Sequence, residues 1–402
     1  MNLRNRAIVG TAALIMIFSG TLLGLRTMRE PVQIPVAAVE SAKNAKQGAI
    51  VRIEDTDLNA LPMLDVEIKD AGGPQFLLSD KPEYFRTGNG IAMQEQIKPG
   101  VVRLYVYHVP TPGTDNKIIS AVIENTGDAE MRFRFFKRVF PKPGKDYHLI
   151  GKNGLIGFYD AKPQDEVRTL AAGARMPIDP EMHEAVVSTD VLVHGFYEFE
   201  IDQPARVTVF QRDRDQDGLR VIDDLPKLPR VLEGHHPSGA GRGLFLVSER
   251  TVTLPEGEPF DTAGGAMQVV LADGERDGWI EGVDSLSPDE QSLNKGNYGV
   301  MYRIKLRYAS SDGRGLALLV FNARSGARWC EYQASAAVVG EGEMPAGTVA
   351  IPADQVRYGG PPETVLLQRF APAPAGETRE IELLWSPPGA SCLPNPLILL
   401  PL

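Results

Sequence analysis

The sequence lacks the short motifs that mark common catalytic and metal centres. It holds only six histidines, and His183-Glu184 is followed by Val187 where a zinc-binding helix would need a second histidine. No G-x-S-x-G nucleophile elbow occurs, and no cysteine has a local motif that pairs it with a histidine. The glycine-rich stretch 239–243 precedes a strand pattern rather than a helix, which argues against a nucleotide-binding loop. The motifs therefore assign no catalytic and no cofactor-binding residue.

The remaining histidines have ordinary interpretations. His108 and His194 lie within strand patterns, which predicts hydrogen-bonded side chains in or beside the core. His235 and His236 are adjacent in a loop rich in proline and glycine, where surface imidazoles are expected because adjacent side chains need not converge on one ion.

The chain also lacks an excess of basic residues. Its net charge of −10 argues against nucleic-acid partners and anionic lipid surfaces, because phosphate binding needs a concentrated basic surface. Residues that break helices are abundant instead. The 40 glycines and 31 prolines make up about 18% of the chain, against ~12% in average proteins. An all-β fold is favoured, and the length fits about two domains.

One hydrophobic segment is long enough to span a membrane. Residues 7–25, AIVGTAALIMIFSGTLLGL, carry no charge and follow Arg4 and Arg6. At ~1.5 Å per residue a helix of this length nearly crosses the hydrocarbon layer, and the preceding arginines predict that the body lies outside the cytoplasm. We expect residues 1–30 to be a retained membrane anchor, or alternatively a cleaved signal that leaves a secreted protein. Residues 31–63 are polar and weakly periodic, which predicts a flexible stalk.

Short alternating runs fill the rest of the chain and predict antiparallel strands. In VVRLYVYHV, residues 101–109, one face carries Tyr105 and Tyr107, and in MRFRFFKRVF, residues 131–140, the phenylalanines alternate with arginines. We predict one β-sandwich over residues 64–211.

A second series of such runs predicts another β-sandwich over residues 243–402. It includes NYGVMYRIKLRYA, and the segment 310–315, SSDGRG, fits the tight loop of a hairpin. The stretch 212–242 is rich in Asp, Gly and Pro and is predicted to be the linker between the two domains. No repeat of a solenoid or a propeller is present.

Several segments resemble a group of exported β-rich proteins of Gram-positive, spore-forming bacteria, some of them described beside copper-amine-oxidase-like N-terminal repeats. The resemblance spans most of residues 84–402 and rests on VVRLYVYHV with IISAVIENTG, PGKDYHLIGKNG, VLVHGFYEFEI, LPRVLEGHHPSGAGRGLF, NKGNYGVMYRIKLR and IELLWSPPGASCLPNPLILLPL. It implies an envelope or extracellular location and transfers no catalytic motif. The chain departs from the group at Cys392 and at the aspartates that begin at residue 213.

Those aspartates lie in DRDQDGLRVIDD and resemble a calcium loop. Asp213, Asp215 and Asp217 alternate before Gly218, and Asp224 stands at the twelfth position, the pattern of oxygen ligands that Ca²⁺ prefers. A solvated acidic linker is the alternative. It is favoured by the aspartate in place of the bidentate glutamate, by the preceding strand pattern and by the nearby arginines. The two interpretations predict different responses to calcium.

Cys330 and Cys392 are the only cysteines, and both fall in the second predicted domain. In an exported protein they can form a disulfide that closes a loop of about 60 residues and stabilises the fold by roughly 4 kcal/mol. Two unpaired thiols are the alternative.

These patterns together favour a membrane-tethered protein that acts structurally or by binding a component or another protein of the cell envelope. A hydrolase of envelope glycans or peptides is the alternative. An enzyme would gather several carboxylates or histidines in one pocket, whereas a binding protein would expose an apolar or aromatic patch.

Overall fold

Strands dominate the computed structural model, which describes residues 32–86, 88–110, 115–231, 238–321, 332–353, 357–358, 363–391 and 393–402. The longest helix in these ranges has 14 residues, and none there combines the length and the apolar character that crossing a bilayer requires. The prediction of an all-β fold is therefore confirmed. The predicted membrane helix, residues 1–30, lies outside the described residues.

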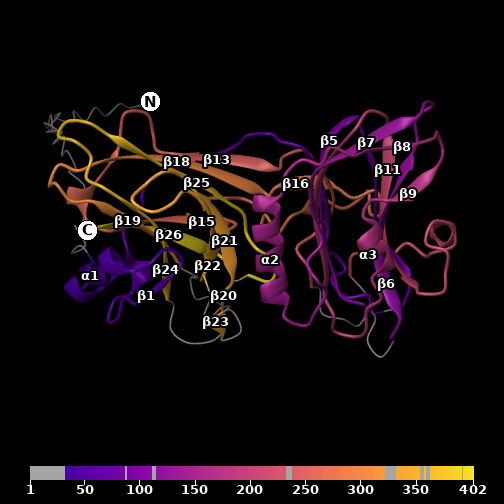
Figure 1. Ribbon diagram of the computed structural model, residues 1–402, viewed down its shortest axis with the longest axis horizontal. Coiled ribbons are helices and arrows are strands. Elements are labelled where there is room, and N and C mark those ends of the chain that lie inside the picture. The colour runs from indigo at the N-terminus through magenta and orange to yellow at the C-terminus, as the bar shows by residue number, and fades with distance from the viewer. Residues whose placement is uncertain are drawn as a thin grey trace, which may run out of the picture. The chain divides into compact units, whose positions relative to one another are not determined.

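Two sheets pack around one core in the half of the fold that carries most strands of residues 75–213 (Figure 1). The larger sheet has the order β17 (Ser292–Leu293), β16 (Glu281–Val283), β12 (Arg242–Phe245), β3 (Gln75–Ser79), β5 (Gly100–His108), β10 (Val193–Ile201), β7 (Met131–Val139) and β8 (Val167–Leu170). The smaller has the order β4 (Gly90–Ile97), β11 (Ala205–Asp213), β6 (Lys117–Asn125) and β9 (Arg175–Pro177). Alternate residues of β5, such as Leu104, and of β6, such as Ile119, fill the space between them.

Two further sheets enclose the second core. One contains β2 (Glu67–Asp70), β13 (Glu249–Thr253), β18 (Met301–Ala309), β25 (Arg379–Trp385), β21 (Ser335–Val339) and β22 (Gly347–Ile351), with β14 (Phe260–Asp261) also paired to β18. The other contains β1 (Ile50–Val51), β24 (Thr364–Phe370), β19 (Leu316–Val320), β26 (Asn395–Pro401) and β15 (Met267–Leu271). On β18 the aromatic and aliphatic residues are buried and the alternating basic residues are exposed, as the sequence pattern predicts.

The remaining elements are short. They are α1 (Val36–Asn44), α2 (Tyr147–Asp160), α3 (Pro180–Glu184), three 3-10 turns at Leu58–Ala60, Val221–Asp223 and Thr262–Gly264, and the paired strands β20 (Tyr332–Gln333) and β23 (Arg357–Tyr358). Most described strand pairs are antiparallel, but β3 with β5 and β18 with both β13 and β14 are parallel.

The loop 310–315 does not close a hairpin, so that prediction is wrong. Strand β18 pairs with β13 and β25, whereas β19 pairs with β24 and β26 in the facing sheet. Every residue of β19 is buried, so this strand needs a core on both faces. The loop is held against the neighbouring 3-10 turn, where the Thr262 hydroxyl donates to Asp312 Oδ1 over 2.6 Å.

Strand pairing also crosses the linker predicted at 212–242. Strand β12, which begins at the last residue of this stretch, pairs with β3 from Arg242 opposite Ser79 to Phe245 opposite Phe76. Strand β2, which precedes the first predicted domain's central strands, pairs with β13 of the second half. Residues Val32–Leu402 accordingly form one unit, because apolar side chains on both sides of the predicted boundary share the same sheets.

The segment 31–63, predicted to be a flexible stalk, folds onto the second half from Val32 onward. Helix α1 buries Ala38 and Ala42, and β1 pairs with β24. Leu58 and Leu61 join the same cluster as Leu319 of β19. The stalk prediction fails because these few apolar residues, although weakly periodic, cover the outer face of an otherwise unprotected sheet.

Helix α2 lies between the two halves and contacts β10 and β7 on one side and β21 and β22 on the other (Figure 1). The Asp146 side chain caps it by accepting from Leu149 N over 3.0 Å. Its glycines permit this close packing: a Cβ built on Gly154 would lie 2.2 Å from Nε2 of His194. Phe158 of α2 stacks on Phe196 of β10 with ring centroids 3.8 Å apart.

Candidate functional site

An open groove of about 910 Å³ lies beside β3, β12 and β16 of the larger sheet and reaches the end of β4. Its wall is mainly apolar, and the groove is lined by Gly73, Pro74, Gln75, Gln96, Lys98, Pro99, Gly100, Val101, Leu244, Leu246, Glu281, Gly282 and Val283. Leu246 is 72% exposed and Val283 is 60% exposed, an uncommon state for large aliphatic side chains that share one surface. This apolar surface is a candidate binding site.

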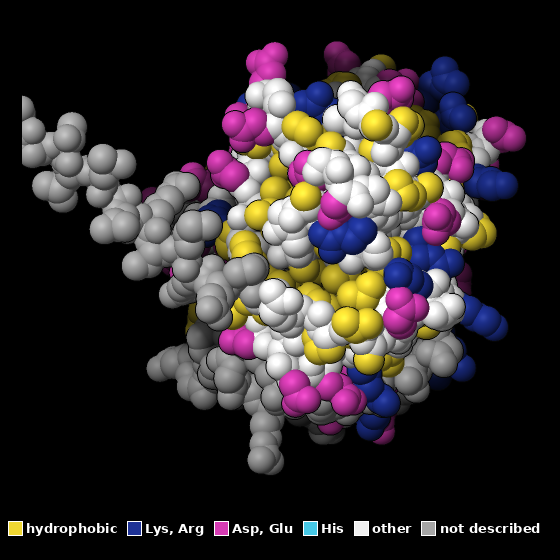
Figure 2. All heavy atoms as spheres, turned by 90° about the vertical axis from the view of Figure 1, so that its left-hand side faces the viewer, with side chains coloured by type: hydrophobic (Ala, Val, Ile, Leu, Met, Phe, Trp, Pro, Cys, Tyr) yellow, Lys and Arg dark blue, Asp and Glu magenta, His cyan; other side chains and the backbone are white. Residues whose placement is uncertain are grey.

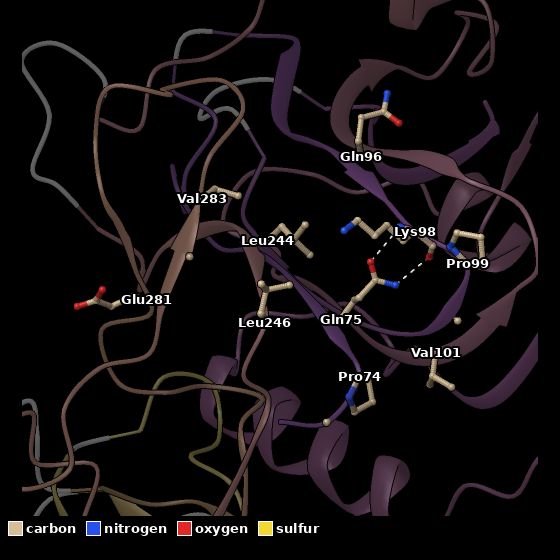
Figure 3. Close-up of a pocket in the computed structure, with 13 residues that line it drawn as sticks. Pro74, Gln75, Gln96, Lys98, Pro99, Val101, Leu244, Leu246, Glu281 and Val283 are labelled. Atoms are coloured by element: carbon tan, nitrogen blue, oxygen red, sulfur yellow. Dashed lines mark hydrogen bonds between the residues drawn. The ribbon is translucent and has the colours of Figure 1, made fainter. Parts of the chain in front are cut away.

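The polar side chains of the groove are held at its margin. Figure 3 shows Leu244 and Leu246 opposite Gln75 and Lys98, with Glu281 pointing away from them. The Gln75 amide donates to Lys98 O over 2.8 Å and accepts from Lys98 N over 2.9 Å, which fixes the β3 side of the groove. The apolar wall is therefore left to face solvent or a ligand.

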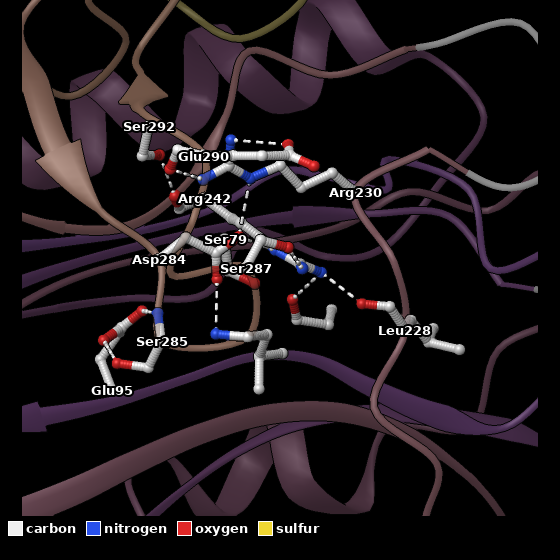
Figure 4. Close-up of polar contacts among 12 residues, drawn as sticks. Ser79, Glu95, Leu228, Arg230, Arg242, Asp284, Ser285, Ser287, Glu290 and Ser292 are labelled. Carbon is white, nitrogen blue, oxygen red and sulfur yellow. Dashed lines mark hydrogen bonds and ion pairs between the residues drawn. The ribbon is translucent and has the colours of Figure 1, made fainter.

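A buried ion pair supports the β12 and β16 side of the groove (Figure 4). The Arg242 guanidinium donates to Asp284 Oδ2 over 2.7 Å, and both side chains are fully buried. The same guanidinium donates to the carbonyl oxygens of Ala92 and Leu228, and Arg230 donates to the same Asp284 oxygen over 2.7 Å. Asp284 directly follows Val283, so these bonds position the apolar wall.

The charges of this network shift the pKa values of its members. Burial works against ionised Asp284, but the hydrogen bonds and charges of Arg242 and Arg230 outweigh it and hold the pKa of that carboxyl below its usual value. Burial lowers the pKa of Arg242. Nearby, Glu95 accepts from Ser285 N over 2.8 Å, and burial raises the pKa of Glu95.

A second, smaller pocket of about 220 Å³ lies where five chain segments meet. It is lined by Asp80, Glu83, Tyr105, Tyr107, Gly239, Ala240, Lys295, Tyr298, Gly389 and Ala390. Asp80 Oδ2 accepts from Ala240 N over 2.6 Å. Asp80 Oδ1 and the hydroxyls of Tyr105 and Tyr107 are buried and have no hydrogen-bond partner in the part of the chain that the structure describes.

The acidic groups of this pocket are shifted toward their neutral forms. Burial and the neighbouring Glu83 carboxyl raise the pKa of Asp80 well above its usual value, and burial raises the pKa of Glu83. Burial and the Asp80 carboxyl raise the pKa of Tyr105. The pocket therefore disfavours the ionised form of each of these groups.

The predicted calcium loop is occupied by protein contacts. Asp213 ends β11 and accepts from Lys117 Nζ and from Asn89 Nδ2, each over 2.6 Å, and the Lys117 bond lowers the pKa of Asp213. Asp217 accepts from Leu219 N over 2.9 Å, while Asp215 and Asp224 are exposed. Within the described ranges, no three His, Cys, Asp or Glu side chains are placed to hold a metal ion together. The structure thus does not bring the four aspartates together as ligands.

His108 and His194 are hydrogen-bonded core side chains, as predicted. His108 contacts Ser79 Oγ over 2.7 Å and Pro82 O over 2.9 Å, and His194 contacts Val106 O over 2.8 Å. Burial lowers the pKa of each to about 4. Cys330, Cys392 and the pair His235-His236 lie outside the described residues.

The residues of both cavities were missed at the level of sequence. Asp80 and Glu83 belong to no motif, and Leu246 and Val283 are isolated aliphatic residues in loops or short strands. The one available signal was the pair Tyr105 and Tyr107 on one face of a strand pattern.

The charged side chains on the surface are mixed in sign. On the face shown in Figure 2, Lys and Arg side chains are interspersed with Asp and Glu side chains and with hydrophobic ones. Such a surface offers no concentrated positive field to a polyanion on that face.

Comparisons with known proteins give no assignment. No family model and no curated protein matches the chain. A solved structure of the CUB1-EGF-CUB2 domain of human MASP-1/3 aligns with 9% identity and a TM-score of 0.17, covering 77% of this chain and 100% of that one. Oxalate decarboxylase from Bacillus subtilis at pH 4.6 aligns with 10% identity and a TM-score of 0.12, covering 83% and 77%. Likenesses at such TM-scores carry no argument about fold or function.

Proposed function

We propose that the protein is an exported binding protein of the cell envelope, tethered by residues 7–25, with two β-sandwich halves outside the membrane. Its groove would take an extended apolar peptide segment from another envelope protein. The observation that carries the proposal is the apolar groove of about 910 Å³, which both Leu246 and Val283 line with exposed side chains. The uncharged run and the resemblance to exported β-rich proteins support the location.

The shape and chemistry of the groove favour a peptide over other ligands. An extended peptide presents alternate side chains to opposite sides, so apolar side chains can enter while its backbone meets the exposed groups at the rim, Gln96, Lys98 and Glu281. An acyl chain has no polar groups to pair with that rim. None of the lining residues is aromatic, so the groove offers no flat ring on which a sugar could stack.

The hydrolase alternative has weaker support. Asp80 and Glu83 share a pocket of only about 220 Å³, which is too small for a glycan or peptide polymer. Another pocket, of about 550 Å³, is lined by Asp160, Asp179 and Glu181, but Arg138 pairs with the last two of these carboxylates. The larger groove has Glu281 as its one lining carboxylate, and that side chain points away from the apolar wall (Figure 3). A single remote carboxylate does not supply a general acid and a general base.

Calorimetric titration tests the proposal with a short capped peptide of alternating leucine and serine residues and, separately, with decanoate. Saturable peptide binding is expected for the wild-type protein, and Leu246→Asp should abolish it because a charge would replace the apolar contact. The matched control is Val36→Asp, since Val36 is also an exposed aliphatic residue but lies on α1.

The possible outcomes distinguish a peptide from an acyl chain as the ligand of the groove. Binding of decanoate without the peptide would identify an acyl-chain site and refute the peptide proposal. Equal peptide binding by Leu246→Asp and wild type would show that the groove is not the site.

A further inference from the structure

The small pocket contains an unusual group of unsatisfied oxygens. Asp80 is 7% exposed, Tyr105 2% and Tyr107 4%, and Asp80 Oδ1 and both phenol oxygens have no hydrogen-bond partner among the described residues. Buried polar groups almost always have a partner in folded proteins. Three such atoms lining one cavity indicate that a ligand completes their bonding.

We propose that this pocket binds a small organic cation through a primary ammonium group. An ammonium group offers three N–H donors, and the pocket offers three unfilled acceptors in Asp80 Oδ1 and the oxygens of Tyr105 and Tyr107. The volume of about 220 Å³ admits a ligand of only a few heavy atoms beyond that group. This site is separate from the groove and does not depend on the function proposed for it.

Two acids of the pocket can supply the negative charge that a bound cation needs. Asp80 and Glu83 both line it, and Glu83 also accepts hydrogen bonds from Ser238 and Gly239. The cations that act on these two acids include Lys81, which is half-buried, and Arg86, which is exposed. Lys295 also lines the pocket, and its side chain is exposed.

The backbone around the pocket is shaped to keep Asp80 in place. Gly239 has a φ of 90°, and a Cβ built on it would lie 1.8 Å from the Asp80 carbonyl oxygen, so only glycine fits there. The neighbouring Ala240 amide donates to Asp80 Oδ2, which leaves Oδ1 as the carboxyl oxygen without a partner among the described residues.

Binding would be coupled to loss of a proton. Burial and Glu83 raise the pKa of Asp80, so its carboxyl holds a proton to higher pH than an ordinary aspartate does. An ammonium ligand favours the ionised carboxylate, and the Asp80 proton would pass to solvent when the ligand enters. No covalent bond forms or breaks.

The test is calorimetric titration of the full chain with ethanolammonium chloride. Ethylene glycol serves as a neutral probe of similar size, and sodium chloride controls for ionic strength. Saturable binding is expected for ethanolammonium alone, with a heat that changes between buffers of different ionisation enthalpy because a proton is released. Asp80→Asn should weaken binding at least about tenfold, since one charged hydrogen bond is lost.

Matched variants make the outcome decisive. Asp128→Asn removes the same charge from an exposed turn and should bind as the wild type does. Tyr107→Phe removes one acceptor and should also weaken binding, which keeps the test usable if Asp80→Asn is misfolded. Equal affinity for ethylene glycol, undiminished binding by both pocket variants, or no saturable heat with folded wild-type protein would overturn the proposal.

Discussion

Replacing Asp284 by alanine should destabilise the protein strongly. Arg242 and Asp284 are fully buried, and Arg242 would keep its carbonyl partners but lose the carboxylate to which it donates. Removing one member of a buried ion pair leaves an uncompensated charge, which costs about 3–5 kcal/mol of unfolding free energy. Arg230 would lose the same partner, although its contacts with Glu290 and with Gln291 O remain.

Urea unfolding followed by tryptophan fluorescence measures this loss. The matched control is Glu382→Ala, which breaks the exposed pair with Lys305 and should cost no more than about 1 kcal/mol. Because the pKa of Asp284 is held below its usual value, its stabilising effect is present above the usual carboxyl pKa and is lost as the pH falls through the lowered one. The gap between wild type and Asp284→Ala should therefore narrow in acid. Equal losses for Asp284→Ala and Glu382→Ala at neutral pH would refute the argument.

Three further predictions follow from other parts of the chain. Asp213→Ala should lower the unfolding free energy by about 1–3 kcal/mol because buried Lys117 loses its carboxylate, whereas exposed Asp215→Ala should change it by no more than about 0.5 kcal/mol. A calcium-dependent rise in melting temperature that Asp215→Ala abolishes would instead support the calcium loop. The raised pKa of Asp80 means that the folded state retains a proton that the unfolded state releases. The free energy of unfolding should therefore fall as the pH rises above the ordinary carboxyl pKa. A pH series of urea melts should show a smaller fall for Asp80→Asn than for the wild type. Protease added to intact spheroplasts should digest the body that follows residues 7–25, and full protection would contradict export.

Alternation in the sequence predicts strands and their faces but not their partners. Tyr105 and Leu104 lie on opposite faces of β5, as the pattern requires, yet both are buried because the larger sheet has a core on each side. The same period-two pattern fits a strand paired to its neighbour in sequence or to a distant one. That ambiguity is why the turn at 310–315 was interpreted as a hairpin and why the pairing of β12 with β3 was not foreseen.

Helix α2 was hidden by its composition. Gly151, Gly154 and Gly157 lower the helix propensity of the segment, so the sequence alone does not predict a helix there. In the structure these glycines let the helix approach β10 and its neighbours closely, and Asp146 caps its start. Tertiary packing therefore outweighs propensity here.

The candidate sites depend on contacts between residues far apart in the chain. Asp80 meets Ala240 across 160 positions, and Arg242 meets Asp284 across 42. No local motif marks either pair, because an isolated arginine or aspartate in a loop is usually a solvated side chain. The tyrosines of β5 were visible on one face, but the residues that face them come from four other segments.

Hydrogen–deuterium exchange with and without the alternating leucine-serine peptide tests the central claim, that the groove is a binding site for an extended apolar segment. We predict slower amide exchange in Arg242–Phe245 and Glu281–Val283, the strands that bear the apolar wall, and unchanged exchange in Val36–Asn44. In Leu246→Asp, adding the peptide should not slow amide exchange in these strands. Protection confined to other parts of the chain, or none at saturating peptide, would contradict the account.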